Sequence, residues 1–409
     1  MGGAVMARRG LQPFFGAAPN LKGLAALKNI AGGFNPAILF ANGEQGAWYD
    51  PSDMSTMFQD SGGTTPVTAS GQPVGLMLDK RLPKGPELIS NGDFSSLDFP
   101  VGFVAPAGVT AAIVDGRLEV TQTAGGGTGM AYIAIPTVIG QSYQVKFDFL
   151  KAGGGRFYIG GSVGAGAQYT SYVLDAQRIY VATSTTTYLS FGEPSNSGNP
   201  QRYDNLSFRE IPGNHRSQPT TAARPTLMQE NGLWYLQPDG VDDFMLTPAF
   251  NWGSDKLSWL MGARRLDAVS RGIVEFSANW NTNLGSFFHW ANDSGGAWVF
   301  GSRGTAAAAG AQIVGFTAPA PDTAIIYTSH DIAGSVSKGR RNGVATVDAA
   351  GAKGTGNFGN YPVYHYMRGG VSNPFNGRDY GSIAINRLLS ESEMVTAEKW
   401  MAAKTGVVL

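Results

Sequence analysis

The side chains able to do acid, base or nucleophilic chemistry are scattered along this sequence. The four histidines lie in four different segments: His215, His289, His330 and His365. No His-x-x-x-His or Glu-x-x-His pattern occurs, and the absence of cysteine removes a thiol nucleophile. A glycosidase needs two facing carboxylates, and spacing alone pairs none of the candidates, which are Asp242, Asp243, Glu275, Asp293 and Asp331. We therefore expect a protein that is not an enzyme.

A second group of residues has the composition of a sugar-binding surface. Glycan sites combine an aromatic ring, which stacks on the apolar face of a sugar, with amide and carboxylate hydrogen-bonding groups. One stretch of the sequence supplies such groups at Trp280, Asn281, Asn283, Asn292 and Asp293, and an earlier stretch supplies Tyr169, Tyr172 and Arg178. For the neighbouring aromatic residues Phe288, Trp290 and Trp298, a buried core is the favoured interpretation. Trp280 is expected at a loop tip and is the strongest surface candidate.

Acidic residues also follow a Pro-Asp-Gly turn at Pro238–Gly240. Asp239, Asp242 and Asp243 offer the hard oxygen ligands that divalent cations prefer, although the spacing of an EF-hand is absent. Hydrogen bonding within the turn is the favoured interpretation. This turn lies inside Arg224–Thr247, which is predicted to form a hairpin from two strands, Leu233–Gln237 and Asp243–Thr247.

Composition indicates an all-β protein with two domains. The 409 residues include 57 glycines and 22 prolines but only 15% charged residues, which suits short strands joined by many turns. Thirty basic residues balance thirty acidic ones, so no global field favours nucleic acid or an anionic membrane. No window approaches the ~18 apolar residues of a membrane span. Pro13, Pro19, Asn20 and Lys22 interrupt the apolar run that a secretory signal requires, so we expect synthesis in the cytoplasm without an export signal.

The elements that must position these residues are mostly strands. Residues 84–211 contain six to eight short strands and no long helix, which predicts a self-contained antiparallel sandwich. Strands are also expected throughout residues 212–389, and one helix is expected at Ser390–Lys404, with Ser390 as cap and Glu393 at the capping-box position. Residues 1–35 form a glycine- and alanine-rich arm in which Asn20–Ile30 has the pattern of a short amphipathic helix. A disordered tail and an arm that orders against a partner are both open.

Two resemblances concern the sequence outside residues 84–211. The run Phe375–Ser390 with Glu393 resembles the closing strand and helix of concanavalin A-like, laminin-G-type jelly rolls, and Gly240–Phe244 resembles their early acidic hairpin. The segments GEQGAWYDPSD, TTPVTASGQPVGLMLDK and NHRSQPTTAARPTL resemble bacteriophage tail and virion structural proteins, in which the last two run almost directly into each other. Their separation here implies a jelly roll built from residues 36–80 and 212–409, with residues 84–211 inserted into one of its loops.

The inserted module also has a likeness. Its ends, Leu88–Phe94 and Tyr203–Phe208, resemble the first and last strands of jelly-roll carbohydrate-binding modules, in which acidic residues near both ends often hold a structural calcium ion. The resemblance carries that role onto Asp93 and Asp204. The alternative is that both carboxylates cap backbone N–H groups in turns.

Taken together, these features predict a non-enzymatic virion protein, a tail fibre or tail-tip component that contacts host-surface glycans through its β-sandwich modules. Other virion proteins would be partners of the N-terminal arm, and homo-oligomerisation would add avidity. A purely architectural capsid or tail decoration protein and a polysaccharide depolymerase are the alternatives.

Overall fold

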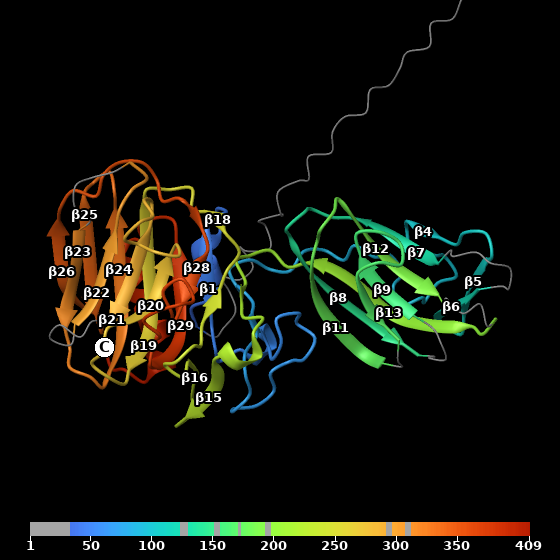
Figure 1. Cartoon of the computed structure of the whole chain (residues 1–409), viewed down its shortest axis with the longest axis horizontal. Coiled ribbons are helices and arrows are strands. Elements are labelled where there is room, and N and C mark those ends of the chain that lie inside the picture. Colours follow the sequence, from blue (N-terminus) through green and yellow to red (C-terminus); the bar gives the residue numbers. More distant parts are fainter. Residues whose placement is uncertain are drawn as a thin grey trace, which may run out of the picture.

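The computed structural model describes residues 33–122, 130–150, 156–170, 173–192, 198–291, 297–306 and 312–409. The predicted arm helix Asn20–Ile30 lies outside these residues. Within them the chain consists of strands, short 3-10 turns and an α-helix near the C-terminus, so the expected all-β class is confirmed. Two β-sandwiches lie beside each other along the long axis of the molecule (Figure 1). In the described part of the chain, no helix combines the length and apolarity needed to cross a membrane.

The first sandwich contains two large sheets and a short ribbon. The first sheet has the order β15 (Thr226–Glu230), β16 (Leu233–Gln237), β29 (Gly377–Ile385), β19 (Lys256–Arg265), β24 (Asp322–Asp331), β25 (Val336–Arg341) and β26 (Val344–Ala350), with β1 (Gly46–Tyr49) also paired to β29. The second has the order β2 (Met57–Phe58), β3 (Leu76–Met77), β14 (Arg216–Ser217), β17 (Met245–Leu246), β28 (Val363–His365), β20 (Arg271–Phe276), β21 (Phe287–Ala291), β22 (Ala297–Ser302) and β23 (Gln312–Thr317). The ribbon pairs β18 (Phe250–Asn251) with β27 (Asn360–Tyr361). Strands from before residue 80 and after residue 212 therefore share both large sheets.

Aromatic side chains fill the space between these two sheets. Trp252 and Phe287 have no exposed surface, and Trp259 is 1% exposed. Their rings pack at centroid distances of 5.2 Å from Trp252 to Phe287 and 5.6 Å from Trp259 to Phe287. Because large aromatic residues remove much apolar surface from water, they dominate the stability of such a core.

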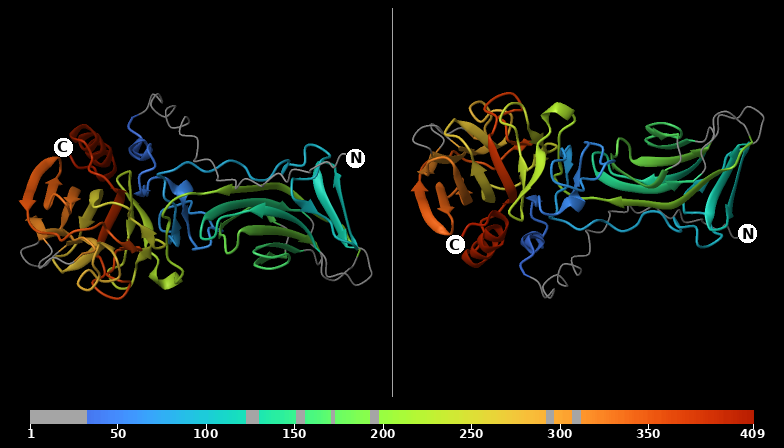
Figure 2. Two further views of the ribbon diagram at one scale, coloured as in Figure 1. Left: turned by 90° about the horizontal axis from the view of Figure 1, so that it is seen from above. Right: turned by 90° about the horizontal axis from the view of Figure 1, so that it is seen from below.

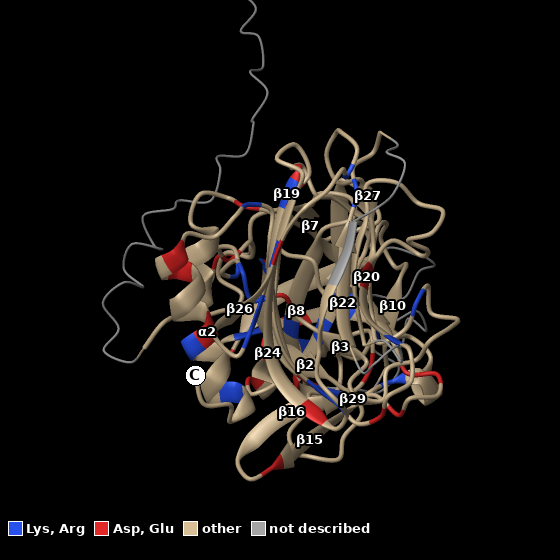
Figure 3. Ribbon diagram, turned by 90° about the vertical axis from the view of Figure 1, so that its left-hand side faces the viewer, with Lys and Arg blue, Asp and Glu red and all other residues tan. Residues whose placement is uncertain are grey.

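Helix α2 (Glu391–Thr405) covers the outer face of the first sheet (Figure 3). Ser390 accepts a hydrogen bond from the backbone N–H of Glu393, and the Glu393 carboxylate accepts from the backbone N–H of Ser390, which completes the expected capping box. Gly406 ends the helix in the left-handed conformation. Ala397 and Met401 lie on the inner face of the helix and are fully buried against this sheet.

The predicted hairpin at Leu233–Thr247 is wrong. Strand β16 forms as expected, but its hairpin partner is β15, reached through a turn in which Asn231 and Gly232 both have positive φ. Asn-Gly is the sequence most typical of such a turn. The Pro238–Gly240 turn instead carries the chain from the first sheet to the second, where β17 pairs with β14 and β28. A tight turn thus reverses the chain here without pairing the strands on either side of it.

The second sandwich is built from residues within 84–211. One sheet has the order β10 (Ala167–Tyr169), β9 (Arg156–Gly160), β12 (Thr186–Gly192), β7 (Ala131–Pro136) and β4 (Phe103–Val104). The other has the order β11 (Val173–Val181), β8 (Ser142–Phe149), β13 (Gln201–Glu210), β6 (Arg117–Gln122) and β5 (Val109–Val114). Alternate residues of β8 point into the core between them, as the sequence pattern predicts, and each is at most 2% exposed: Tyr143, Val145, Phe147 and Phe149.

A small apolar cluster joins the two sandwiches. Phe58, Leu76 and Leu78 of the first sandwich pack with Ile179 and Ile211, which belong to the second sandwich and the segment leaving it. The backbone N–H of Ile179 donates to the carbonyl of Gly62 at 2.9 Å. The views in Figure 2 show the connecting segments running side by side between the sandwiches. The contact is therefore made by strand β11 as well as by the two chain crossings.

Candidate functional site

The aromatic residue predicted at a loop tip is buried. Trp280 is 4% exposed, because the Arg303 guanidinium lies 4.6 Å from its ring centroid and Phe288 packs edge-on at 4.8 Å. Its backbone N–H donates to the buried carboxylate of Glu275. The expectation of a stacking platform at this position is therefore wrong. Phe288 and Trp298 are also in the core, at 5% and 2% exposure, whereas Trp290 is half-buried beneath Arg368.

The polar residues predicted to surround Trp280 have structural hydrogen bonds. The backbone N–H of Asn281 donates to the side chain of Asn279 at 2.9 Å, and the carbonyl of Asn283 accepts from Ser286 and Arg303. Asn281 is exposed and Asn283 is half-buried. Asn292 and Asp293 lie outside the described residues. Asn281 and Asn283 therefore belong to a turn that is held by local hydrogen bonds, and not to a sugar-binding cluster around Trp280.

The candidates in the second sandwich do not form one surface. Tyr169 points into the core, where its ring lies 4.7 Å from that of Phe147. Arg178 is on β11 in the opposite sheet, close to Gly62 at the junction with the first sandwich. Tyr172 lies outside the described residues. The residue types predicted from sequence were suited to sugar binding, but the sequence did not show on which sheet, or on which side of it, each residue lies.

The proposed calcium residues lie within each other's electrostatic influence. Burial raises the pKa of Asp204, and the charges of Asp148 and Asp93 add to that effect. Asp93 accepts from the N–H and hydroxyl of Ser95, and Asp204 accepts from the N–H of Asn205 at 2.7 Å. These bonds are the turn caps of the alternative interpretation. A calcium ion at this position stays a prediction.

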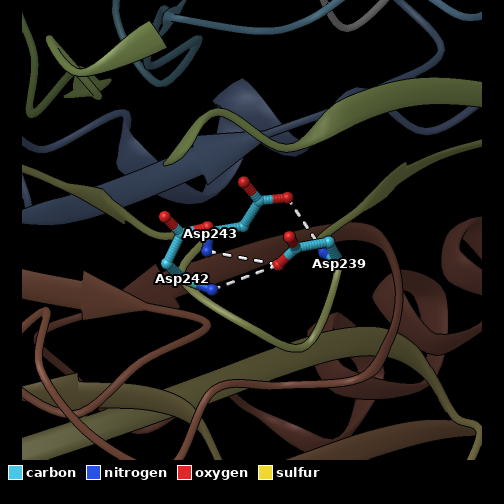
Figure 4. Close-up of side chains that lie close together, drawn as sticks. All are labelled: Asp239, Asp242 and Asp243. Carbon is cyan, nitrogen blue, oxygen red and sulfur yellow. Dashed lines mark hydrogen bonds between the residues drawn. The ribbon is translucent and has the colours of Figure 1, made fainter. Parts of the chain in front are cut away.

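The acidic turn after β16 brings three carboxylates together within 4.8 Å of one another (Figure 4). Asp239 Oδ1 accepts from the backbone N–H groups of Val241, Asp242 and Asp243, and Asp243 Oδ2 accepts from the N–H of Asp239 at 2.9 Å. Burial, with the charges of Asp239 and Asp242, raises the pKa of Asp243 to about 6. The hydrogen bonds show a self-capped turn, in agreement with the favoured interpretation from sequence.

All four histidines are buried, at no more than 5% exposure. His330 Nδ1 lies 2.8 Å from Ser337 Oγ, and Lys353 Nζ donates to the same oxygen at 2.5 Å. Burial lowers the pKa of Lys353 to about 8. A serine held between an amine and an imidazole has the composition of a nucleophile with its base. Ser337, His330 and Lys353 nevertheless have no exposed surface, so a substrate has no access to this group in the described conformation.

In the described part of the chain, the outer face of the sheet β10-β9-β12-β7-β4 carries a pair of tyrosine rings in contact. Tyr132 of β7 and Tyr188 of β12 point outward. The residues before and after each of them are buried, and successive side chains of a strand point to opposite faces of the sheet. The two tyrosine rings meet edge to face at 5.5 Å. Tyr188 stands opposite Ala134 on one side and Gly160 on the other, so no large side chain flanks it in its row. We call Tyr132, Tyr158 and Tyr188 the tyrosine face.

Strand register places polar groups in the same rows. One row runs across all five strands through Val104, Tyr132, Ser190, Tyr158 and Gln168. Arg156 donates to the Tyr158 hydroxyl at 3.1 Å. The N–H of Gly164 donates to Ser190 Oγ at 3.0 Å, which places backbone over the centre of the row and leaves Tyr158 only 9% exposed. Tyr132 and Tyr188, both half-buried, with Gln168 and Val104, both exposed, are the accessible members.

The sequence contained a signal for this face. In AYIAIP, the apolar residues Ala131, Ile133 and Ile135 alternate with Tyr132, and Tyr188 alternates in the same way with Thr187 and Leu189. That period of two places each tyrosine on the side opposite the core. Their meeting depends on the pairing of β7 with β12, two strands separated by 49 residues in the chain, and local pattern does not give that pairing.

A hollow of about 420 Å³ lies elsewhere, on the outer face of the first sheet beside α2. Its floor includes Lys338 and Asp348, which form an ion pair at 3.5 Å, and its wall includes Leu389 and Met394. Tyr327, the aromatic residue in its lining, is only 4% exposed. The hollow has the volume of a ligand site but offers a sugar little aromatic surface.

Comparison with known proteins does not assign a family. No family model matches the chain, and no curated protein sequence matches it. Among solved structures, the botulinum neurotoxin serotype D binding domain has 10% identity and a TM-score of 0.31 over 44% of this chain and 47% of that one. A Trypanosoma rangeli sialidase has 9% identity and a TM-score of 0.32 over 80% and 68%. A putative carbohydrate-binding protein from Bacteroides ovatus has 10% and 0.27 over 66% and 78%. The chain spans about half the length of the neurotoxin domain, and at these scores nothing about function follows.

Proposed function

We propose that this protein is a non-enzymatic glycan-binding protein whose second sandwich binds sugar on the tyrosine face. The observation that carries this proposal is the pair Tyr132 and Tyr188, which point outward on adjacent strands with their rings 5.5 Å apart. Such rings offer apolar surface to a pyranose, and Gln168 and Arg156 supply donors and acceptors at the side. Both rings are half-buried on the surface of a sheet, so the face suits a glycan chain that lies along the sheet.

The burial of the residues that could act as acid, base or nucleophile supports binding without catalysis. The histidines and the Lys353–Ser337 pair are enclosed, and Glu275 is held by Arg368 at 2.9 Å and is 1% exposed. Asp331 pairs with Lys256 at 3.4 Å. A glycosidase would need two of its carboxylates free and opposed across a cleft. The ion pairs of Glu275 and Asp331 therefore support sugar binding rather than hydrolysis.

We further propose that the chain acts in a virion, as a tail fibre or tail-tip component that adsorbs to host-surface glycans. The support is the sequence likeness of residues 43–80 and 214–227 to bacteriophage structural proteins. Those segments meet around Asp79, whose carboxylate accepts hydrogen bonds from Trp48 and Asn214. Immuno-electron microscopy of purified particles tests this part. Labelling at the tail is expected, and particles without label would remove the virion assignment but not the glycan site.

Glycan binding is tested by an array screen of the full chain, followed by affinity measurements on the best oligosaccharide. The double variant Tyr132→Ala/Tyr188→Ala should weaken binding about tenfold or more, because both stacking surfaces are lost. Tyr364→Ala is the matched control, since Tyr364 is a half-buried strand residue of the first sandwich between the buried Val363 and His365. An array with no bound glycan, or equal losses in the double variant and the control, would overturn the proposal.

A further inference from the structure

A loop of the second sandwich exposes large apolar side chains. Leu97 is 83% exposed, Val101 is 81% exposed and Phe99 is 40% exposed, all within five residues. Single exposed apolar residues are ordinary on protein surfaces, but three within five residues concentrate apolar surface on one loop. We call residues 96–101 the apolar loop.

Hydrogen bonds from the preceding turn hold the apolar loop in place. Asn91 donates its side-chain N–H groups to the carbonyls of Ser96 and Asp98, at 3.1 and 2.6 Å, and accepts from the N–H of Ser96 at 3.1 Å. Ser90 Oγ accepts from the N–H of Val101 at 2.9 Å. A loop fixed in this way loses little conformational entropy when a ligand covers it, which favours binding.

Aromatic stacking fixes the same loop to the sheet. The ring of Phe99 stacks on that of Phe103 at a centroid distance of 4.5 Å and an interplanar angle of 8°. Phe103 in turn packs against the core of the second sandwich. The part of Phe99 that is exposed is therefore held in a fixed position on the sandwich.

The apolar loop leads directly into the edge strand of the tyrosine face. Beyond Val101, the carbonyl of Gly102 accepts from the N–H of Ala134 at 3.1 Å, and Val104 stands opposite Tyr132. Side chains directly opposite each other on antiparallel strands lie on the same side of the sheet. Val104, which is 40% exposed, therefore continues the tyrosine face to the margin where the apolar loop begins.

We propose that the apolar loop forms one end of the glycan site and selects sugars that carry a methyl or acetyl substituent. This inference rests on the proposed function. A sugar hydroxyl placed against Leu97 or Val101 would lose hydration without gaining a hydrogen-bond partner, whereas the methyl of a 6-deoxy sugar or an acetyl group would gain apolar contact. The selected class is thus deoxy or acetylated glycans, in preference to fully hydroxylated ones.

The test compares matched ligands on the full chain. Oligosaccharides ending in 6-deoxy-D-galactose and in D-galactose form one pair, and an O-acetylated polysaccharide with its de-O-acetylated form is the second. Wild-type protein should prefer the substituted member by about four- to fifteenfold, the value expected for burying one or two carbon groups. Leu97→Ser/Val101→Ser should bring this ratio close to one while binding of the unsubstituted member is kept. Val269→Ser, at a residue 51% exposed on the first sandwich, is the matched control.

The outcomes separate this inference from the proposed function. Tyr132→Ala/Tyr188→Ala should weaken both members of each pair, because it removes the shared stacking surface. If wild-type protein binds both members equally, or if the loop variant keeps the preference, selection by the apolar loop is refuted and glycan binding stands. If wild-type protein binds no member of either pair and no glycan on the array, both proposals fall.

Discussion

Asn214 donates its backbone N–H to Asp79 Oδ2 at 2.8 Å, although the two residues are 135 positions apart. Asp79 Oδ1 accepts from the N–H groups of Trp48 and Arg81, at 2.9 Å each, and the N–H of Asp79 donates to His215 Nδ1 at 2.9 Å. One carboxylate, in a residue 3% exposed, therefore holds strand β1 and both chain segments that connect the two sandwiches. The second sandwich departs from the first at a point where the incoming and outgoing chains are already joined.

Removing this carboxylate should destabilise the first sandwich. Asp79→Ala leaves buried backbone N–H groups and the Nε–H of Arg81 without their acceptor, and we expect a loss of about 3 kcal/mol or more in unfolding free energy. All eight tryptophans lie outside residues 84–211, so tryptophan fluorescence in urea reports on the first sandwich. Asp348→Ala is the control, because that carboxylate is 73% exposed, and it should change stability by less than about 0.5 kcal/mol. A loss for Asp79→Ala equal to that of the control would contradict this role.

Lys353 should make the stability of the protein rise with pH above about 8. Burial lowers its pKa to about 8, and its amine contacts the hydroxyls of Ser302 and Ser337. Between about pH 8 and its unfolded value of about 10.4, the unfolded chain binds a proton that the folded chain does not, so stability increases with pH. Lys353→Met removes this dependence. At pH 7.5 the variant should have the larger unfolding free energy, because it buries no charge. This difference from wild type should shrink by about 2 kcal/mol between pH 7.5 and pH 10.

Urea titrations of wild type and Lys353→Met at the two pH values measure this change, because the difference between the proteins cancels most other titrating groups. Lys338→Met, at a side chain 59% exposed, is the control for the replacement of a lysine by methionine. A constant difference between wild type and Lys353→Met would show that the Lys353 amine has an ordinary pKa in the folded protein.

Much of the fold was predictable because its signals are local. Ser390, Glu393 and Gly406 specify the start and end of α2 within one short segment, and alternation in Gln141–Phe149 identifies the buried side of β8. The hairpin error has the opposite origin. Pro238–Gly240 specifies that the chain reverses, but the partner of β16 is decided by tertiary packing and by the Asn231–Gly232 turn.

The candidate site was less predictable, because its residues come together through long-range pairing. Trp280 has the sequence surroundings of a loop tip, yet Arg303, which lies 23 residues later, covers its ring. Tyr132 and Tyr188 each lie in a strand with readable alternation, but the register of β7 with β12 brings them side by side. The alternation of apolar and polar residues therefore predicts on which side of its strand a residue lies. Its neighbours on the adjacent strands are known only from the assembled sheet.

Asp243 should oppose stability at neutral pH. Its pKa is raised to about 6 by burial and by the charges of Asp239 and Asp242, so protonation favours the folded state. The stabilisation is fully present below the unfolded pKa of about 3.9 and is lost as the pH rises through about 6. Asp243→Asn keeps an oxygen acceptor for the N–H of Asp239 and removes the charge. Since water screens a surface turn, we expect a gain of about 1 kcal/mol at pH 7.5 and almost none at pH 4.

Thermal or urea unfolding of Asp243→Asn at the two pH values measures this gain. Asp242→Asn is the control, because Asp242 is exposed and its side chain holds no backbone group of the turn in the contacts described above. It should give a smaller gain by removing one neighbouring charge. If Asp243→Asn lowers stability at pH 7.5, the ionised carboxylate is needed by the turn, and a bound cation would become the better account of the three aspartates.

The cap of α2 should contribute to the stability of the first sandwich. Ser390→Ala removes the oxygen that accepts from the N–H of Glu393 and should cost about 1 kcal/mol, the usual effect of losing a serine cap. Ser392→Ala changes the same residue type two positions later; its hydroxyl lies 3.3 Å from Ser390 Oγ but accepts no backbone N–H of the first turn in the contacts described, so its loss should cost less than half as much. Because Trp400 packs against the core beneath α2, tryptophan fluorescence during urea unfolding follows both variants. Equal costs for the two substitutions would mean that Glu393 and Arg387, joined at 2.7 Å, hold the start of the helix without the serine hydroxyl.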